Sequence, residues 1–178
     1  MGSEERVIKT EKVYEGRVVT LRCDTVELPG QKYAKREIVD HAGGVTIVAL
    51  TEDNKIPFVK QFRIATGKHL LELPAGLIDH NENPKQAALR ELEEETGWLA
   101  EDVKFLVEFY TSPGFTNEKV HIFKAENLKK TQVNFDDTEN IEIIELTMEE
   151  ALHKIKLGEI IDAKTIVGLL YVEMESRK

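Results

Sequence analysis

The chain has 178 residues, of which 41% are apolar, and a formal net charge of −9. This length suits one domain, or one domain with a small appendage, and the apolar content is sufficient for a buried core. The acidic balance argues against a nucleic-acid backbone or an anionic membrane as the main partner. Because Cys23 is the only cysteine, the composition excludes an internal disulfide and a thiolate metal cage.

The sequence carries no targeting signal that we recognise. No apolar run approaches the length of a membrane span, and the start MGSEER lacks the basic-then-apolar order of a secretory signal. Arg6 stands where a myristoylation motif needs Ser or Thr. We therefore expect a soluble cytoplasmic protein.

The first part of the chain predicts extended structure, with three extended segments expected over residues 13–40. Residues 13–40 contain VVTLRCDTVEL and YAKREIVD, which alternate and are separated by a turn at Pro29 and Gly30. After Gly43, VTIVALT is a nearly continuous apolar run, typical of a strand buried on both faces. IPFVKQFR is predicted to be its neighbouring strand. HLLELPAGLI, which carries Glu72, is predicted to be one further strand.

A helix of roughly thirteen residues, about 20 Å long, follows. Asn83 is its predicted N-cap, Pro84 occupies the first helical position and Gly97 ends it. Leu89 and Leu92 are predicted to face the core.

The C-terminal half of this helix is crowded with acidic residues. At about 100° per residue, Glu91 and Glu95 lie one turn apart on one face with Glu94 beside them. Arg90 precedes Glu94 by four residues, where it can hold that carboxylate. We expect Ala87 and Ala88, one turn earlier, to leave open space beside the glutamates for a bulky group.

Like charges at this spacing destabilise a helix by about 0.2–0.5 kcal/mol per pair, so something must offset the repulsion. Mg²⁺ is the natural candidate, because it binds carboxylate oxygens and bridges to substrate phosphates. The alternative is that ELEEE is only a solvated acidic face.

The spacing of Gly76, Glu82, Arg90-Glu91, Glu94-Glu95 and Gly97 resembles the Nudix box of the Nudix hydrolase superfamily. Trp98 departs from the pattern, since the family usually has an aliphatic residue there. The resemblance implies an α+β fold, a Nudix α/β/α sandwich with a mixed sheet, preceded by an antiparallel β-meander. We accordingly expect residues 1–42 to form the meander and residues 43–178 the Nudix hydrolase domain.

The resemblance also implies the metal and the catalytic machinery. The metal would be Mg²⁺, with Mn²⁺ as an alternative, and the implied ligands are the main-chain carbonyl of Ala75 and the side chains of Glu91, Glu94 and Glu95. Glu94 and Arg90 are further expected to act in catalysis, and Gly76 lets the backbone approach the cation.

Beyond the helix, VKFLVEFY predicts a strand, and the loop TSPGFTNEK follows. Pro113 lies sixteen residues beyond Gly97, which resembles the marker of the ADP-ribose pyrophosphatase branch. This implies that Ser112, Gly114 and Glu118 face the substrate, although Glu118 is as readily explained as a surface residue.

The remaining segments are predicted as strand KVHIFKA, acidic loop NFDDTEN, strand IEIIEL and two helices. The resemblance implies that a glutamate of this loop approaches the metals or acts as the base. Glu139 is the best match, with Asp137 and Asp136 as alternatives. Thr147 is expected to cap the first helix and Asp162 the second.

The implied function is Mg²⁺-dependent hydrolysis of ADP-ribose to AMP and ribose 5-phosphate. Arg63 would hold the pyrophosphate, since a guanidinium forks onto phosphates, and Glu72 would lie beside it. Arg36 and Glu37 would form the nucleoside end, and the meander would join two copies as a homodimer. The alternatives are another nucleotide sugar, such as GDP-mannose, or a non-catalytic Nudix domain that senses a nucleotide.

Overall fold

The computed structural model describes residues 4–131 and 141–177, which form two compact units. The described residues up to Gly43, joined by Tyr110–Lys119, form the N-terminal unit. Gly44–Phe109 and the described residues from Val120 onward form the core unit. None of the helices in the described part of the chain is long and apolar enough to cross a membrane.

The N-terminal unit is a three-stranded antiparallel sheet in the order β1-β2-β3. The strands span Arg6–Glu15, Val19–Leu28 and Lys32–His41, so the meander is confirmed and its first strand begins earlier than predicted. The loop after Tyr110 is tied to β3, because Val39 N–H donates to the Phe115 carbonyl at 2.8 Å. Asn117 adds two bonds, accepting from His41 N–H at 2.9 Å and donating to Asp40 at 3.0 Å.

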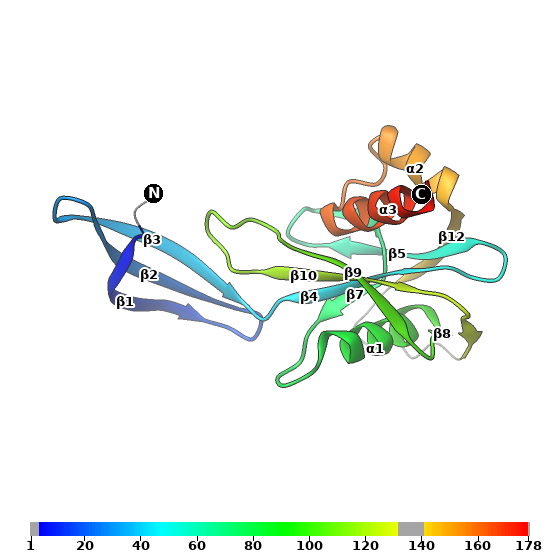
Figure 1. Cartoon of the computed structure of the whole chain (residues 1–178), viewed down its shortest axis with the longest axis horizontal. Coiled ribbons are helices and arrows are strands. Elements are labelled where there is room, and N and C mark those ends of the chain that lie inside the picture. Colours follow the sequence, from blue (N-terminus) through cyan, green and yellow to red (C-terminus); the bar gives the residue numbers. More distant parts are fainter. Residues whose placement is uncertain (1–3, 132–140, 178) are drawn as a thin grey trace. The chain divides into compact units, whose positions relative to one another are not determined.

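The core unit contains a mixed four-stranded sheet in the order β7-β4-β10-β9 (Figure 1). These strands span Ala75–Leu77, Gly44–Ala49, Lys119–Ala125 and Val103–Tyr110. β4 runs parallel to β10 and antiparallel to β7. The confirmed fold class is therefore α+β with a mixed sheet.

A second, antiparallel sheet has the order β12-β5-β6, with bounds Glu142–Thr147, Lys55–Arg63 and Lys68–Glu72. Two predictions about these strands were wrong. β5 pairs with β12 and β6, and not with β4. HLLELPAGLI is two strands, because Pro74 cannot donate a ladder hydrogen bond and the chain changes sheets there.

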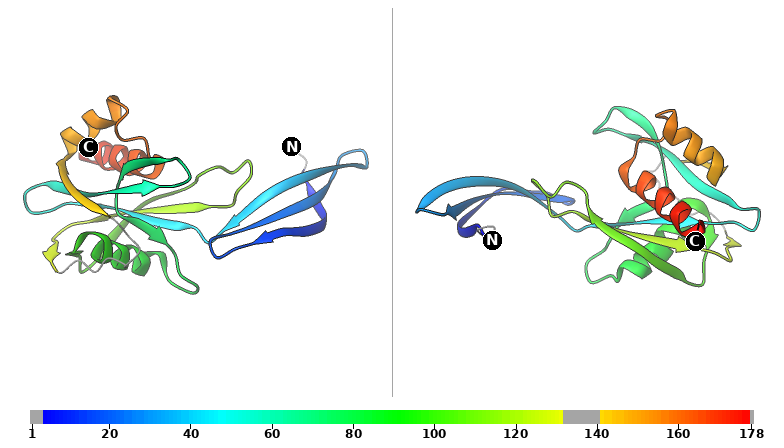
Figure 2. Two further views of the ribbon diagram at one scale, coloured as in Figure 1. Left: turned by 180° about the vertical axis from the view of Figure 1, so that it is seen from behind. Right: turned by 45° about the horizontal axis from the view of Figure 1, so that its top comes forward.

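The helices α1 (Pro84–Thr96) and α3 (Ala163–Ser176) lie on opposite sides of the β4 sheet, and α2 (Met148–Lys156) packs against α3 and β12 (Figures 1 and 2). β4 explains the layering, because its successive side chains point to opposite faces. Val45, Ile47 and Ala49 join the buried cluster that contains α1 residues, whereas Val48 joins the cluster that contains α2 and α3 residues. The expectation of a strand buried on both faces is confirmed.

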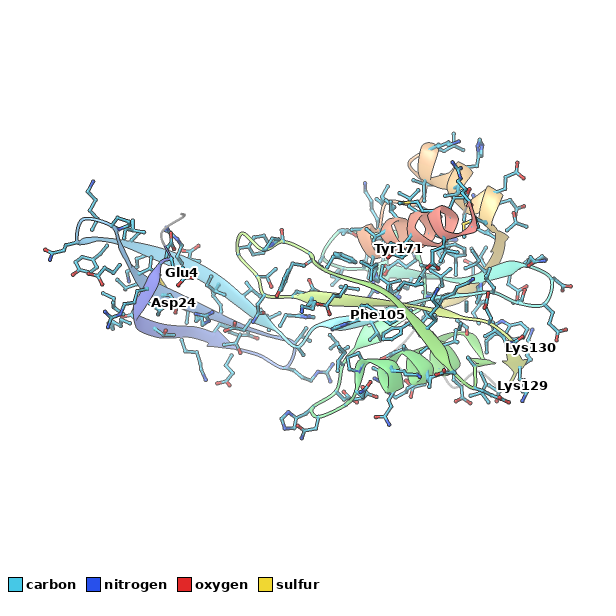
Figure 3. All side chains as sticks on the ribbon, viewed as in Figure 1. Glu4, Asp24, Phe105, Lys129, Lys130 and Tyr171 are labelled. Atoms are coloured by element: carbon cyan, nitrogen blue, oxygen red, sulfur yellow. The ribbon has the colours of Figure 1, made fainter. Side chains whose placement is uncertain are left out.

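The predicted caps of α2 and α3 are confirmed. Thr147 and Glu150 form a capping box at α2, and the Asp162 carboxylate accepts from Thr165 N–H at 3.0 Å at α3. A short ribbon of β8 (Trp98–Leu99) and β11 (Lys129–Lys130) follows α1. Trp98 packs against the α1 cluster, and Lys130 Nζ lies 5.1 Å from its ring centroid. Figure 3 labels Lys129 and Lys130, the two residues of β11.

Candidate functional site

The acidic helix α1 has the boundaries that its sequence predicts. The Asn83 side chain accepts from Lys85 N–H at 2.9 Å, Pro84 is the first helical residue, and Gly97 ends the helix at a left-handed φ of 66°. A fixed start and stop determine which residues face the sheet. Leu92 is fully buried, as expected of a core residue.

The expectation of open space at Ala87 and Ala88 was wrong. Both side chains are fully buried in the cluster under the sheet. The side of α1 that carries Ala87 and Ala88 therefore packs against the sheet. The carboxylates of α1 are all at the C-terminal end of the helix.

Gly76 brings that carboxylate end against the backbone of β7. A side chain at position 76 would overlap the Glu91 carboxyl group, so the missing Cβ is what lets Glu91 lie there. Glu95, only 5% exposed, accepts a hydrogen bond from Ala75 N–H at 2.9 Å. Two carboxylates from successive turns thus converge on the adjacent residues Ala75 and Gly76.

Arg90 joins most of the remaining acidic groups. Its guanidinium donates to Glu82 at 3.0 and 2.9 Å, to Glu91 at 2.6 Å and to Glu94 at 3.1 Å. It also donates to the Leu77 carbonyl at 3.1 Å. The hydrogen bond to Glu82 is the main reason that the pKa of Arg90 is raised and the pKa of Glu82 is lowered. Arg90 and Glu82 are therefore held in their ionised forms.

The donor set suits a hard divalent cation, because it offers carboxylate oxygens and the carbonyl of Ala75, the first residue of β7. Glu91 and Glu95, fixed against β7, are the best placed of these groups. Among residues 4–131 and 141–177, no three His, Cys, Asp or Glu side chains are gathered to hold a metal ion. Glu91 and Glu94 are paired with Arg90, which supplies the neutralising charge in this arrangement.

A second charged cluster begins three residues before Ala75. Glu72 is buried, and it accepts from Arg63 Nε at 2.7 Å and from Arg63 Nη2 at 2.8 Å. It also accepts from Lys164 Nζ, which donates to Asp162 at 2.9 Å. Burial alone would raise the pKa of Glu72, but hydrogen bonds and charge attraction from Arg63 and Lys164 outweigh it and lower that pKa.

The pKa of Arg63 is raised, mainly by its hydrogen bonds to Glu72 and in part by the charge of Glu95. Arg63 is thus influenced by the charge of one α1 carboxylate, that of Glu95, within the core unit. The sequence predicted that Arg63 and Glu72 lie at the substrate, but it did not predict that Lys164 joins their cluster. It lies 92 positions after Glu72, inside a segment recognisable only as a helix start.

The other predicted substrate residues belong to the N-terminal unit. Arg36 donates to Glu5 at 2.9 Å, and Glu37 is exposed. Glu118 accepts from Thr111 at 2.7 Å, and its carboxylate lies 3.6 Å from His41 Nδ1. Ser112 and Gly114 lie in the turn beside β3, with open space around Gly114. The predicted base Glu139 and its alternatives Asp136 and Asp137 lie outside the described residues.

Comparisons with known families match both parts of the chain. Residues 40–166 match the model of the NUDIX domain, and residues 5–39 match the nucleoside diphosphate sugar hydrolase N-terminal domain. The two matches together span most of the chain.

Similar proteins extend this result over nearly the full length. The chain is 45% identical to a methanol dehydrogenase activator of Bacillus methanolicus and 42% identical to an ADP-ribose pyrophosphatase of Bacillus subtilis (strain 168). Each alignment covers 97% of this chain and 94% of the relative. A GDP-mannose pyrophosphatase of Escherichia coli O1:K1 / APEC is 38% identical over 79% of this chain and 78% of its own.

A solved structure titled "Crystal structure of ADP compounds hydrolase" has the same fold, with a TM-score of 0.86 at 22% identity. The superposition covers 98% of this chain and 95% of that one.

Proposed function

The chain belongs to the Nudix hydrolase family, and from that premise we propose that it hydrolyses ADP-ribose to AMP and ribose 5-phosphate with Mg²⁺ as its cofactor. The observation that carries the proposal is the convergence of Glu91 and Glu95 on Ala75 and Gly76, beside a cluster that contains Arg63. The choice of substrate is supported by two relatives named ADP-ribose pyrophosphatase, at 42% and 38% identity.

In this proposal the carboxylates of α1 bind the metal. Glu91, Glu94 and Glu95, with the Ala75 carbonyl, hold the divalent ion, Mg²⁺ or Mn²⁺. When bound, that ion supplies neutralisation of the phosphate oxygens and activation of water. Arg90 orients Glu91 and Glu94 through its hydrogen bonds to both.

The other predicted residues are assigned to substrate recognition. Arg63 donates to the diphosphate. Of the five N–H groups of its guanidinium, two donate to Glu72, and the others can donate to an anionic ligand. Glu72 holds Arg63, and Gly76 keeps β7 open to the site. Arg36, Glu37, Ser112, Gly114 and Glu118 of the N-terminal unit are assigned to the nucleoside and terminal ribose. Glu139, or else Asp137 or Asp136, takes the proton from the attacking water.

We also propose that the active form is a homodimer joined through the N-terminal sheet. The support is the unusual exposure of its apolar side chains: Val7, Ile8, Val13, Tyr14 and Tyr33 are between 48% and 61% exposed. Burying such a surface against a second copy would be favourable.

The proposal is tested by a panel of nucleoside diphosphate derivatives incubated with Mg²⁺ in ¹⁸O-labelled water. ADP-ribose should be the best substrate, and mass spectrometry of AMP and ribose 5-phosphate reports which phosphorus was attacked. A higher kcat/KM for GDP-mannose than for ADP-ribose would identify GDP-mannose as the substrate and leave the reaction class unchanged. Absence of product from every diphosphate would contradict the proposal and favour a nucleotide-sensing role.

A second candidate function is activation of an alcohol-oxidising dehydrogenase. It is favoured by the 45% identity to a protein named methanol dehydrogenase activator over 97% of the chain. Adding the protein to a methanol dehydrogenase and measuring alcohol oxidation tests it. The Glu95→Gln variant separates activation that needs hydrolysis from activation by binding alone.

A further inference from the structure

Lys164 belongs to a chain of contacts that runs from the start of α3 to Arg63. Its Nζ donates both to Asp162, the cap of α3, and to the buried carboxylate of Glu72. The Arg63 guanidinium donates to both oxygens of that carboxylate, and it shares one of them, Oε2, with Lys164. Two cations from distant parts of the sequence therefore share one carboxylate.

The same end of α3 also fixes the backbone that carries Glu72. Thr165 is fully buried, and its hydroxyl accepts from Leu73 N–H at 2.8 Å while donating to Asp162 at 2.6 Å. Asp162 accepts from both Lys164 and Thr165, so one carboxylate orders a side chain and a backbone group that both support Glu72. The side chain of Lys164 is only 18% exposed, which suits a fixed internal group.

We infer that Lys164 is a positioning residue: it pins Glu72 to α3, and Glu72 in turn holds the Arg63 guanidinium in one orientation toward the diphosphate. The inference deepens the proposed function and depends on it for the role of Arg63. Removing Lys164 would leave Glu72 and Asp162, two neighbouring carboxylates, to share Arg63 as the remaining cation of the cluster. Their mutual repulsion would move Glu72, and a guanidinium attached to a displaced carboxylate loses its fixed geometry.

A purely structural role predicts a different outcome. If the cluster only attached α3 to β6, its loss would lower the melting temperature without changing substrate affinity. If it positions Arg63, affinity for the diphosphate must fall in folded protein at temperatures well below melting.

The test is a double-mutant cycle of Lys164→Met and Arg63→Met in the full-length protein. Lys164→Met should raise the KM for ADP-ribose about tenfold, a size typical of coupled residues, with kcat within about twofold of the unchanged protein. Combining it with Arg63→Met should raise KM no further than Arg63→Met alone. Lys60→Met, which removes an exposed ion pair with Glu142 on the same sheet, is the matched control and should leave KM unchanged.

A second measurement does not depend on turnover. The Nε–H proton of Arg63, bonded to Glu72 at 2.7 Å, should exchange slowly with water in ¹⁵N-resolved spectra and faster in Lys164→Met. If Lys164→Met does not fold, Lys164→Arg keeps the charge and should give an intermediate KM and exchange rate.

An unchanged KM and unchanged proton exchange in a less stable protein would overturn the inference. Additive effects in the cycle would also overturn it, because Lys164 would then act independently of Arg63. If the unchanged protein hydrolyses no diphosphate, the proposed function fails, and the proton exchange still decides whether Lys164 orders Arg63.

Discussion

Gly76 has no Cβ, and this is what allows the Glu91 carboxylate of α1 to lie against the backbone of β7. Replacing it by Ala places a methyl group where the Glu91 carboxylate lies, so that side chain must move. We expect Gly76→Ala to reduce kcat by about 10- to 100-fold, the range seen when groups that orient a metal ligand are disturbed. The measurement is Mg²⁺-dependent hydrolysis alongside the melting temperature. Gly114→Ala, where a Cβ meets open space, is the control for the melting temperature alone and should leave it unchanged.

Glu95 offers a second test on a single residue. Its glutamine variant keeps an oxygen that can accept from Ala75 N–H, so the fold should persist, while the charge needed for the cation is lost. Turnover at saturating Mg²⁺ should fall at least about 100-fold. Glu93→Gln on the same helix is the matched control, and full turnover by Glu95→Gln would contradict the metal assignment.

For single residues, the sequence predicted which side chains share a helical face, but it did not predict which of them are buried. Spacing placed Glu91, Glu94 and Glu95 on one helical face, because helical periodicity is local. It could not reveal that Ala87 and Ala88 on that face are buried, since burial depends on the sheet beneath. Lys164 was missed for the same reason, because its partner is brought near only by the fold.

The helices illustrate how local chemistry sets the limits of an element. Thr147→Ala removes the hydroxyl that accepts from Glu150 N–H at the start of α2. A lost cap costs about 1 kcal/mol, which corresponds to a fall in melting temperature of about 2–4 °C for a chain of this size. Differential scanning calorimetry measures it, and Thr147→Ser should retain most of the stability. Hydrolysis should be unchanged, and a large loss of activity would indicate that α2 does more than pack.

The strands were predicted well as segments and less well as partners. Helix caps and strand alternation are patterns that lie within a few neighbouring residues. The caps were predicted correctly for the helices, and the alternation for most strands. The pairing of β5 with β12 depends on residues more than 80 positions apart, such as Lys60 and Glu142, and no local signal reports it.

The whole molecule combines a core unit with an N-terminal sheet whose first strand is exposed at all ten positions. If that sheet joins two copies, light scattering after gel filtration should give about twice the chain mass of 20.3 kDa. Val13→Asp should shift the mass toward one copy, because a charge would be buried at the interface. Leu157→Asp, at a similarly exposed apolar residue of the core unit, should not. A mass of one copy for the unchanged protein would contradict the proposed dimer.

The switch of the chain between sheets at Leu73 and Pro74 has a consequence for how such proteins can diversify. Both residues are tied down, Leu73 by Thr165 and Pro74 by Ile47 N–H and the Thr46 hydroxyl. This tether fixes the separation between the Glu72 cluster and Ala75, so an insertion of even one residue there would shift one cluster relative to the other. At the hairpin tip of residues 64–67 the turn hydrogen bonds go to the nearby carbonyls of Arg63 and Ile64, so a longer tip needs only a new local turn. Changes in loop length should therefore accumulate at that tip, while the tether tolerates altered side chains more readily than altered length.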